Sequence, residues 1–333
     1  MKVRAVSAAA MAAAIGLYAT DAGAYLKLGT RIGSEIVSLK WGTLPIRYFV
    51  TNRDVPNVSA PQLQQAIARA FQTWDAAPDV QLGAEFAGFT SISPLQNRSQ
   101  TVLGVADRPD LDRVLGSTSF TVDTVSGEIV EADIFFNSTF PWSTAPAGES
   151  GRYDVESIAL HEIGHLHGLG HSALGETELR AGGRRVLASE AVMFPIAFSP
   201  GSIDQRVLHA DDIAGISDLY QNDAIHQRTG SITGRVTKNG TGVAGAHVMA
   251  FSPGTGKLVA GFTLSDDGSF VIAALDPGAY VVRVEPLDDA DTDSFFDPSM
   301  HVDVNFRPAF YPQLVVVPPG ATSRSVVIPV VSK

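Results

Sequence analysis

The sequence contains no cysteine among its 333 residues. Disulfide bonds, thiolate metal ligands and cysteine nucleophiles are therefore excluded, and any chemistry must come from histidines, carboxylates or hydroxyls. Positive charge is scarce, with 24 Lys and Arg against 35 Asp and Glu. Because phosphate binding needs clustered positive charge, we expect no nucleic-acid partner. Hydrophobic residues make up 45% of the chain, which is enough to bury a core and too many for a disordered protein.

The sequence also lacks an apolar run long enough to cross a membrane as a helix. The run Ala8–Ala19 has 12 residues, against the ~20 that a membrane-spanning helix needs. Lys2 and Arg4 precede this run, and the small residues 22–24 follow it. This order predicts a secretory signal peptide over residues 1–24, cleaved after its last residue, and hence an exported protein. The alternative is an Ala-rich helix at the start of the folded domain.

Helix and strand patterns mix in the first two thirds of the chain. Alternating apolar residues predict strands, and apolar residues spaced three or four apart predict helices with one buried face. The predicted elements are a strand over Pro45–Val50, a helix beginning at Ala60, a hairpin over 120–137, and helices over Asp154–Leu169 and Asp211–Tyr220.

The pattern changes after a polar stretch that follows Tyr220. Beyond Gly230, short strands are separated by Gly, Pro and Asp turns, which is typical of an all-β sandwich. We therefore predict an α+β protein that divides into a signal peptide 1–24, an N-terminal domain 25–222, a linker 223–229 and a β-sandwich 230–333.

One motif, HEIGHLHGLGH, carries the chemistry, and it begins at His161. On a helix, His161 and His165 are about 400° apart and project from nearly the same face. Gly168 allows the chain to leave the helix and turn back, so that His171 can supply a third imidazole. Three neutral nitrogens with water at an open fourth position form a catalytic zinc site, in which Glu162 can take a proton from that water.

His167 lies inside the same motif but is not expected to bind the metal. It follows His165 by two residues, about 200° around the helix, so its ring points away from the other imidazoles. We expect a histidine on the surface or behind the metal ligands.

The motif resembles the zinc signature of the metzincins, and Ser172 directly after the third histidine resembles the matrixin branch. Residues 191–195 resemble the matrixin Met-turn, and residues 208–216 resemble the C-terminal helix with its paired aspartates. The resemblance covers roughly residues 25–220. It implies a metzincin-type zincin domain, a twisted mixed sheet plus three helices, in which Met193 packs beneath the histidines that bind zinc.

Three of these assignments have a plain alternative. Met193 taken alone is an ordinary core methionine. For Asp211 and Asp212, the attraction of acids to a helix N-terminus is the explanation that we favour. In the family, a hairpin strand ahead of the active-site helix lies beside an extended substrate, and Glu128–Phe136 is our candidate for that edge strand. The alternative is an ordinary sheet strand without substrate contact.

The sequence also departs from the family. All eight histidines lie at or after His161, so the histidines of a second, structural zinc are missing and one zinc ion is expected. Without cysteine, the thiolate that blocks the zinc of animal matrixin proenzymes cannot exist. The insert Leu174–Glu190 lengthens the interval between the zinc motif and the Met-turn. A flap beside the cleft and an inert surface loop both fit this insert, and the loop is favoured.

Calcium is left unassigned. Asp289, Asp291 and Asp293 alternate as in a calcium loop. Ser294 stands where an EF-hand has Gly and Met300 where it has a carboxylate, so an EF-hand is excluded. A solvated acidic loop is therefore favoured here, although the matrixin resemblance implies structural calcium somewhere in the domain.

The C-terminal part resembles the carboxypeptidase regulatory-like β-sandwich. The matching segments are turn glycines and alternating core positions over Gly234–Val236, Val243–Ala246, Asp267–Phe270 and Leu275–Tyr280. A spacer, a stabilising module and a surface-binding module all fit this part, since it contains no catalytic constellation.

We therefore predict a secreted zinc endopeptidase that cleaves extended protein or peptide substrates. It would use His161, His165 and His171 as metal ligands and Glu162 as base, as a monomer without a membrane span. The alternative is a non-catalytic secreted binding or adhesion protein, with the β-sandwich as its binding module. The presence of Glu162 favours the enzyme, because a scaffold has no use for it.

Overall fold

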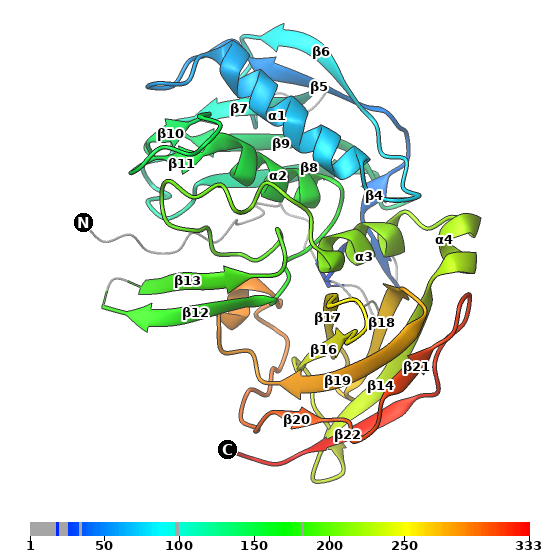
Figure 1. Ribbon diagram of the computed structural model, residues 1–333. Helices are drawn as coiled ribbons and strands as arrows, with labels where there is room; N and C mark the ends of the chain where they lie inside the picture. Colours follow the sequence, from blue (N-terminus) through cyan, green and yellow to red (C-terminus); the bar gives the residue numbers. More distant parts are fainter. Residues whose placement is uncertain (1–17, 20–25, 33–34, 97–99, 182) are drawn as a thin grey trace.

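The computed structural model describes residues 18–19, 26–32, 35–96, 100–181 and 183–333. An α+β domain fills the upper part of Figure 1 and an all-β domain the lower part, so the predicted fold class is confirmed. None of the helices in the described ranges combines the length and the apolar character needed to cross a membrane. The predicted signal peptide lies outside the described residues, except for Tyr18–Ala19, which form strand β1.

The N-terminal domain is built on a mixed sheet. Within the described ranges, six strands form this sheet, with the hydrogen-bonded order β4-β9-β7-β5-β6 and β8 added to β9. Strands β4 and β7 pair with different stretches of one side of β9, and β8 pairs with its opposite side. All neighbours are parallel except β8 and β9. The strands are β4 (Lys40–Trp41), β5 (Ile46–Thr51), β6 (Ala84–Thr90), β7 (Thr101–Ala106), β8 (Gly116–Val122) and β9 (Glu128–Asn137).

Shorter strands pair outside this sheet. They are β2 (Leu28–Ile32), which pairs with β1 and β3 (Glu35–Ser38), and the parallel pair β10 (Trp142–Ser143) and β11 (Tyr153–Asp154).

Two long helices pack against each other beside the sheet. They are α1 (Ala60–Asp75) and α2 (Val155–Leu166). Two shorter helices follow along the chain, α3 (Ala210–Leu219) and α4 (Asp223–Arg228), and α4 occupies most of the predicted linker. The predicted apolar face of α1 is buried, and Trp74 at its end donates a hydrogen bond of 2.8 Å to the carbonyl of Leu160 on α2. This packing fixes α2, and with it the zinc motif, against the core.

The prediction that Glu128–Phe136 forms the sheet edge is wrong. Strand β9 pairs with β7 and β4 on one side and with β8 on the other, so it lies inside the sheet. The edge on this side of the sheet is β8, which runs antiparallel to β9 and pairs with no second strand in the described part of the chain. The hairpin itself was predicted correctly, but its first strand, β8, lies at the edge in place of its second strand, β9.

The insert between the zinc motif and the Met-turn folds as a β-hairpin. Its strands are β12 (Gly175–Arg180) and β13 (Gly183–Ser189), paired antiparallel. The hairpin reaches the C-terminal domain, where Thr177 N donates to the Asp289 carboxylate at 2.7 Å. The insert is therefore a regular hairpin in contact with the C-terminal domain, whereas we had favoured a surface loop. Whether it is inert or acts as a flap beside the cleft stays a prediction.

The C-terminal domain consists of two facing sheets. In the described residues, one has the order β15-β14-β18 with β22 beside β14, and the other β17-β16-β19-β20 with β21 beside β19. Their strands are β14 (Gly230–Lys238), β15 (Thr241–Gly242), β16 (His247–Phe251), β17 (Leu258–Phe262), β18 (Ser269–Leu275), β19 (Gly278–Glu285), β20 (Ala309–Phe310), β21 (Val315–Val317) and β22 (Val326–Val330). Val236, Ile272 and Val282 lie fully buried between the sheets.

An apolar cluster joins the two domains. The N-terminal domain contributes Leu26 and residues between 173 and 196, and the C-terminal domain contributes apolar residues of β17 and of the loop after β19. We call this set the junction cluster: Leu26, Ala173, Val186, Phe194, Ile196, Phe262, Leu287, Ala290, Phe295 and Phe296. The domains thus share a core instead of being held by a linker alone.

Candidate metal centre

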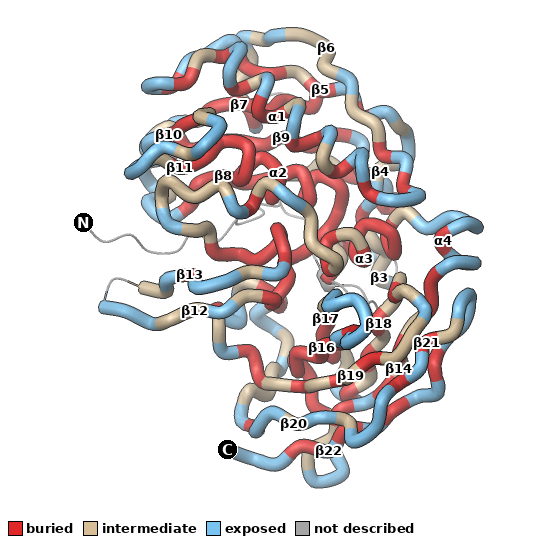
Figure 2. Tube along the Cα trace, in the orientation of Figure 1, coloured by how far each residue is buried: buried red, intermediate tan, exposed pale blue. Residues whose placement is uncertain are grey.

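Helix α2 carries the first part of the zinc motif. Asp154 caps the helix by accepting a hydrogen bond of 2.9 Å from Ser157 N. All residues of α2 are buried, and Figure 2 shows the helix as a red segment within the N-terminal domain. Beyond the helix, Gly168 has a φ of +102°, and a Cβ there would collide with the carbonyl of Leu39. The predicted glycine turn is therefore confirmed.

The structure brings His161, His165 and His171 together. Their ligand nitrogens all lie within 4.8 Å of one another, and the Nε2 atoms of His165 and His171 are 3.2 Å apart. No other group of three or more His, Asp or Glu side chains in the described ranges is placed to hold an ion.

Each of the three imidazoles is oriented by a backbone carbonyl. His161 Nδ1 lies 2.8 Å from the carbonyl of Val192, and His165 Nδ1 lies 2.8 Å from that of Leu169. His171 Nδ1 lies 2.6 Å from the carbonyl of Ser294, in the C-terminal domain. Because a carbonyl only accepts, the proton of each ring is assigned to Nδ1, which leaves the Nε2 lone pairs for a metal.

The histidine cluster fits one zinc ion. In a tetrahedral site with Zn–N bonds of ~2.0–2.1 Å, two ligand nitrogens lie about 3.3 Å apart, close to the 3.2 Å between His165 and His171. Burial lowers the pKa of His161 to about 3 and that of His171 to about 4, and it lowers the pKa of His165 as well. The rings are therefore neutral at physiological pH, as metal ligands must be.

Glu162 lies between the metal centre and the edge strand. Its side chain is 1% exposed, and Thr118 on β8 places its hydroxyl 2.7 Å from Oε2. Burial raises the pKa of Glu162 to about 8, an effect that the Thr118 hydrogen bond opposes. A nearby divalent cation would lower this pKa further. Gly116, also on β8, leaves room for the carboxylate, because a Cβ there would lie 3.0 Å from Oε1.

Met193 packs against the helix that carries the histidines. It is fully buried, and a Cβ at Gly164 would collide with its Sδ. Gly164 lies between His161 and His165 in the sequence, so Met193 contacts the turn that separates these two residues. This position agrees with the Met-turn interpretation.

The paired aspartates are not surface charges at a helix end. Asp211 and Asp212 are both fully buried. The Asp212 carboxylate accepts hydrogen bonds from the backbone nitrogens of Val192 and Met193, at 3.0 and 3.3 Å, and so fixes the Met-turn. It also accepts from His209 N at the start of α3, so the interpretation as helix-capping acids explains only part of its role.

Asp211 connects three parts of the protein. One of its oxygens accepts a hydrogen bond of 2.6 Å from Ser172 Oγ, directly after the third histidine. The other accepts one of 2.7 Å from Ala260 N on β17 of the C-terminal domain. Burial raises the pKa of Asp211 to about 8.

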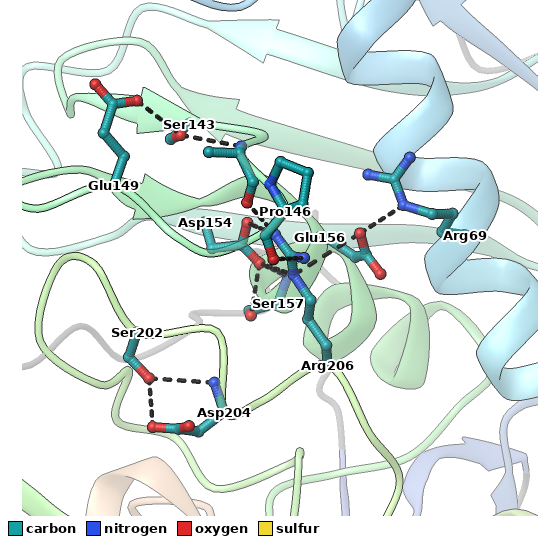
Figure 3. Close-up of polar contacts among 11 residues, drawn as sticks. Arg69, Ser143, Pro146, Glu149, Asp154, Glu156, Ser157, Ser202, Asp204 and Arg206 are labelled. Atoms are coloured by element: carbon teal, nitrogen blue, oxygen red, sulfur yellow. Dashed lines mark hydrogen bonds and ion pairs between the residues drawn. The ribbon is translucent and has the colours of Figure 1, made fainter.

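A charged network fixes the N-terminus of α2 to the loop that follows the Met-turn (Figure 3). Arg206 forms two hydrogen bonds with Asp154, of 2.6 and 2.8 Å, and donates to the carbonyl of Ala145 at 2.9 Å. Arg69 of α1 pairs with Glu156 of α2 at 2.6 Å. The network thereby holds the loop against α2.

A small pocket opens beside His161 and Glu162. Its lining is mostly apolar and comes from the start of β8, from α2, and from the Met-turn and the loop after it: Leu115, Gly116, Ile158, His161, Glu162, Phe194, Pro195, Ala197 and Gln205. The edge strand, the carboxylate and the pocket therefore lie together on one side of the histidine cluster.

His167 does not lie on the surface. It is fully buried among the rings of Phe71, Trp74 and Tyr220, with centroid distances of 6.1–6.3 Å. Neither ring nitrogen has a hydrogen-bond partner among the described residues, and burial lowers its pKa to about 3. As predicted, it stands apart from the three-histidine cluster.

The acidic loop after β19 serves the contact between the domains. Asp289 accepts from Thr177 N, and Asp291 lies 3.8 Å from the guanidinium of Arg184. Asp291 and Asp293 are exposed. The loop is thus only partly the solvated segment that we predicted.

Sequence reasoning missed three residues of the site. They are Thr118 beside Glu162, and Ser294 and Phe295 beside His171. A backbone carbonyl such as that of Ser294 leaves no mark on the sequence. Ser294 is also 123 residues from its partner, so only the tertiary structure brings the two together.

The fold and the histidine cluster define a zincin of the metzincin type. Comparison with known proteins narrows this class. The family described as Matrixin matches residues 40–221, and the carboxypeptidase regulatory-like domain matches residues 231–294. The first match covers more than half of the chain, which therefore belongs to the matrixin family.

Curated relatives match parts of the chain. Metalloendoproteinase 5-MMP of Arabidopsis thaliana is 47% identical over 68 residues, 20% of this chain and 14% of the relative. Stromelysin-1 of Mus musculus is 24% identical over 184 residues, 55% of this chain and 33% of the relative. Metalloendoproteinase 2-MMP of Arabidopsis thaliana is 28% identical over 182 residues, 50% of this chain and 39% of the relative. The chain thus spans well under half the length of these relatives.

Proposed function

We propose that this chain is a secreted zinc endopeptidase that hydrolyses peptide bonds of extended protein substrates. The observation that carries the proposal is the convergence of three neutral, buried imidazoles beside the carboxylate of Glu162. The names of the relatives, which are metalloendoproteinases, support the same class of enzyme.

His161, His165 and His171 would hold the ion through their Nε2 atoms. When bound, zinc supplies positive charge that makes water a nucleophile at neutral pH and polarises the peptide carbonyl. We assign the one expected zinc ion to this histidine cluster.

Glu162 would move the proton. Its carboxylate takes a proton from the attacking water and later delivers it to the amine that leaves. Thr118 holds one carboxylate oxygen, which leaves the other to exchange the proton. Burial raises the pKa of Glu162, which makes its carboxylate a stronger proton acceptor than an exposed one.

Strand β8 and the adjacent pocket would bind the substrate. An extended peptide can add to the open edge of β8 through backbone hydrogen bonds. The pocket beside His161 and Glu162 is lined by apolar side chains, including Leu115, Ile158 and Phe194. We propose that it takes an apolar side chain of the substrate next to the cleaved bond.

The test is cleavage of a chemically unfolded protein by the purified full chain. Cleavage is expected with zinc, is abolished by a chelator, and returns when zinc is restored. The Glu162→Ala variant should lose cleavage while it still binds zinc. Undiminished cleavage by this variant would refute the assigned base, and an inactive wild type that contains zinc would instead favour a binding role.

Secretion requires a separate test. We propose that residues 1–24 direct export and are removed, because a charged start, an apolar run and small residues occur in the order of a signal peptide. N-terminal sequencing of the exported protein should then begin at Tyr25. Retention of Met1 on the exported protein would refute the cleavage site.

A further inference from the structure

The three imidazoles are not oriented by the same part of the protein. The carbonyls that accept from His161 and His165 belong to Val192 and Leu169, both in the N-terminal domain. The carbonyl 2.6 Å from His171 Nδ1 belongs to Ser294. The third histidine is therefore oriented by a domain that provides no side chain to the histidine cluster.

We propose that the C-terminal domain positions the third metal ligand, with Ser294 and Phe295 as the positioning residues. This inference rests on the metal centre proposed above and assigns the C-terminal domain a role in metal binding. It does not require the C-terminal domain to touch the substrate.

The geometry of the loop supports this role. Ser294 ends the short 3-10 helix Thr292–Ser294, and the backbone nitrogens of the next two residues bond back to Thr292, which directs the chain around His171. The Phe295 ring meets the His171 ring edge-on at a centroid distance of 6.0 Å. Phe295 is itself buried in the junction cluster against Phe262, at 5.4 Å. The ligand is thus held by a hydrogen bond and by ring packing.

The hairpin of the N-terminal domain fixes the same loop from the other side. Arg184 donates to the carbonyl of Asp288 at 2.7 Å and to Thr177 Oγ1 at 3.1 Å. Thr177 in turn bonds the carboxylate and the carbonyl of Asp289. The insert therefore holds the segment that leads into Ser294, five and six residues ahead of it. In this account, the insert and the C-terminal domain function as a pair.

Weaker docking should affect His171 more than the other ligands. If the loop moves away, the Nδ1 proton of His171 loses its acceptor and the ring gains freedom, while His161 and His165 keep their carbonyls. Removing the hydrogen-bond partner of a metal-bound histidine typically weakens metal binding by ~10–100-fold.

Two matched pairs of variants in the full chain test this. Phe295→Ala removes the ring that packs on His171. Phe296→Ala removes a neighbouring ring of the same junction cluster that forms no ring contact with His171 in the described structure. Arg184→Ala removes the hydrogen bond to the carbonyl of Asp288 in the loop after β19. Arg185→Ala is its control, because Arg185 pairs with Glu178 inside the hairpin. Neither arginine is part of the buried core, so these two variants should fold even if Phe295→Ala does not.

Zinc affinity, measured by competition with a chelator, is the first readout. We expect Phe295→Ala to weaken zinc binding about tenfold or more and Arg184→Ala about threefold, with changes below twofold in both controls. The second readout is the exchange of the histidine Nδ1 protons with water, followed by NMR on zinc-loaded protein with labelled histidine. The His171 proton should exchange faster in Phe295→Ala and Arg184→Ala, and those of His161 and His165 should not change.

Equal zinc affinity within each pair, or faster exchange of all three protons alike, would overturn the positioning role. A wild-type protein that binds zinc under those outcomes would leave the proposed metal centre intact. A wild-type protein that binds no zinc would overturn both.

Discussion

The two domains contribute to one metal centre in different ways. The N-terminal domain provides the three histidines, the carboxylate of Glu162 and the Met-turn. The C-terminal domain provides one carbonyl and one aromatic ring, both directed at His171. If the proposed metal centre is correct, a domain that provides no metal ligand in the described structure still orients one of the ligands. Mutations can therefore be divided into those that remove a proposed metal ligand or the proposed base and those that remove a contact orienting them.

The largest effect is expected at the residue that carries the chemistry. Glu162→Gln keeps the shape and the Thr118 contact but cannot accept a proton, so kcat should fall by ~10²–10⁴. Zinc content, measured on the same sample, should not change. An equal loss of zinc and activity would mean that Glu162 supports the metal site and does not act as the base.

The next effect is expected where the N-terminal domain supports its own histidines. Asp212→Ala leaves the buried nitrogens of Val192 and Met193 without their acceptor, at ~1–3 kcal/mol each. We therefore expect the free energy of unfolding to fall by about 2–6 kcal/mol in denaturant titrations. Asp211→Ala, which breaks one bond to each domain, should cost less. A larger loss of stability in Asp211→Ala than in Asp212→Ala would mean that the contact between the domains stabilises the site more than the Met-turn contact does.

A smaller loss is expected at the contact between α2 and the Met-turn. A Cβ at Gly164 would collide with Met193 Sδ and lie 2.8 Å from Trp74 Cζ2. Overpacking of this kind costs about 1–3 kcal/mol, so Gly164→Ala should lower the free energy of unfolding by that amount. Gly254→Ala in the C-terminal domain is the control, since a Cβ there meets no atom within 4 Å in the described structure. Similar effects of the two substitutions would refute the proposed packing.

The smallest effect is expected to be a gain. His167→Leu removes two ring nitrogens that lack partners among the described residues, so we expect about 1 kcal/mol of added stability at pH 7. Because burial lowers the pKa of His167 to about 3, only the unfolded state binds a proton there once the pH falls below 6.5. Wild type should therefore lose up to ~1.4 kcal/mol per pH unit at this site on acidification from pH 6.5. Unfolding curves at pH 7 and 5 should show the gain of His167→Leu increasing, and a constant gain would contradict the lowered pKa.

The sequence predicted the parts of the fold that have a local cause. The helix capped by Asp154, the glycine turn at Gly168 and the short strands beyond Gly230 all arise from residues close together in the chain. The position of β8 outside β9 could not be predicted in this way, because it depends on which distant strands pair with β9.

The histidine cluster was predicted as a group, but its surroundings were not. The spacing of His161 and His165 on one helix gives their relation, and the turn at Gly168 brings His171 to them. Of the two positions that we expected for His167, on the surface or behind the metal ligands, its burial excludes the first, because α1 and Tyr220 cover that face. The contact of Ser294 with His171 depends on the docking of two domains, which no local pattern encodes.

The central claim is that three imidazoles bind one zinc ion beside Glu162. The most direct test is elemental analysis of the purified full chain, its Glu162→Gln variant and a variant in which His161 and His165 are both replaced by alanine. The account predicts one zinc per chain in the first two proteins and none in the third. Absence of stoichiometric zinc from the wild type after incubation with the metal, or an unchanged zinc content in the double variant, would contradict it.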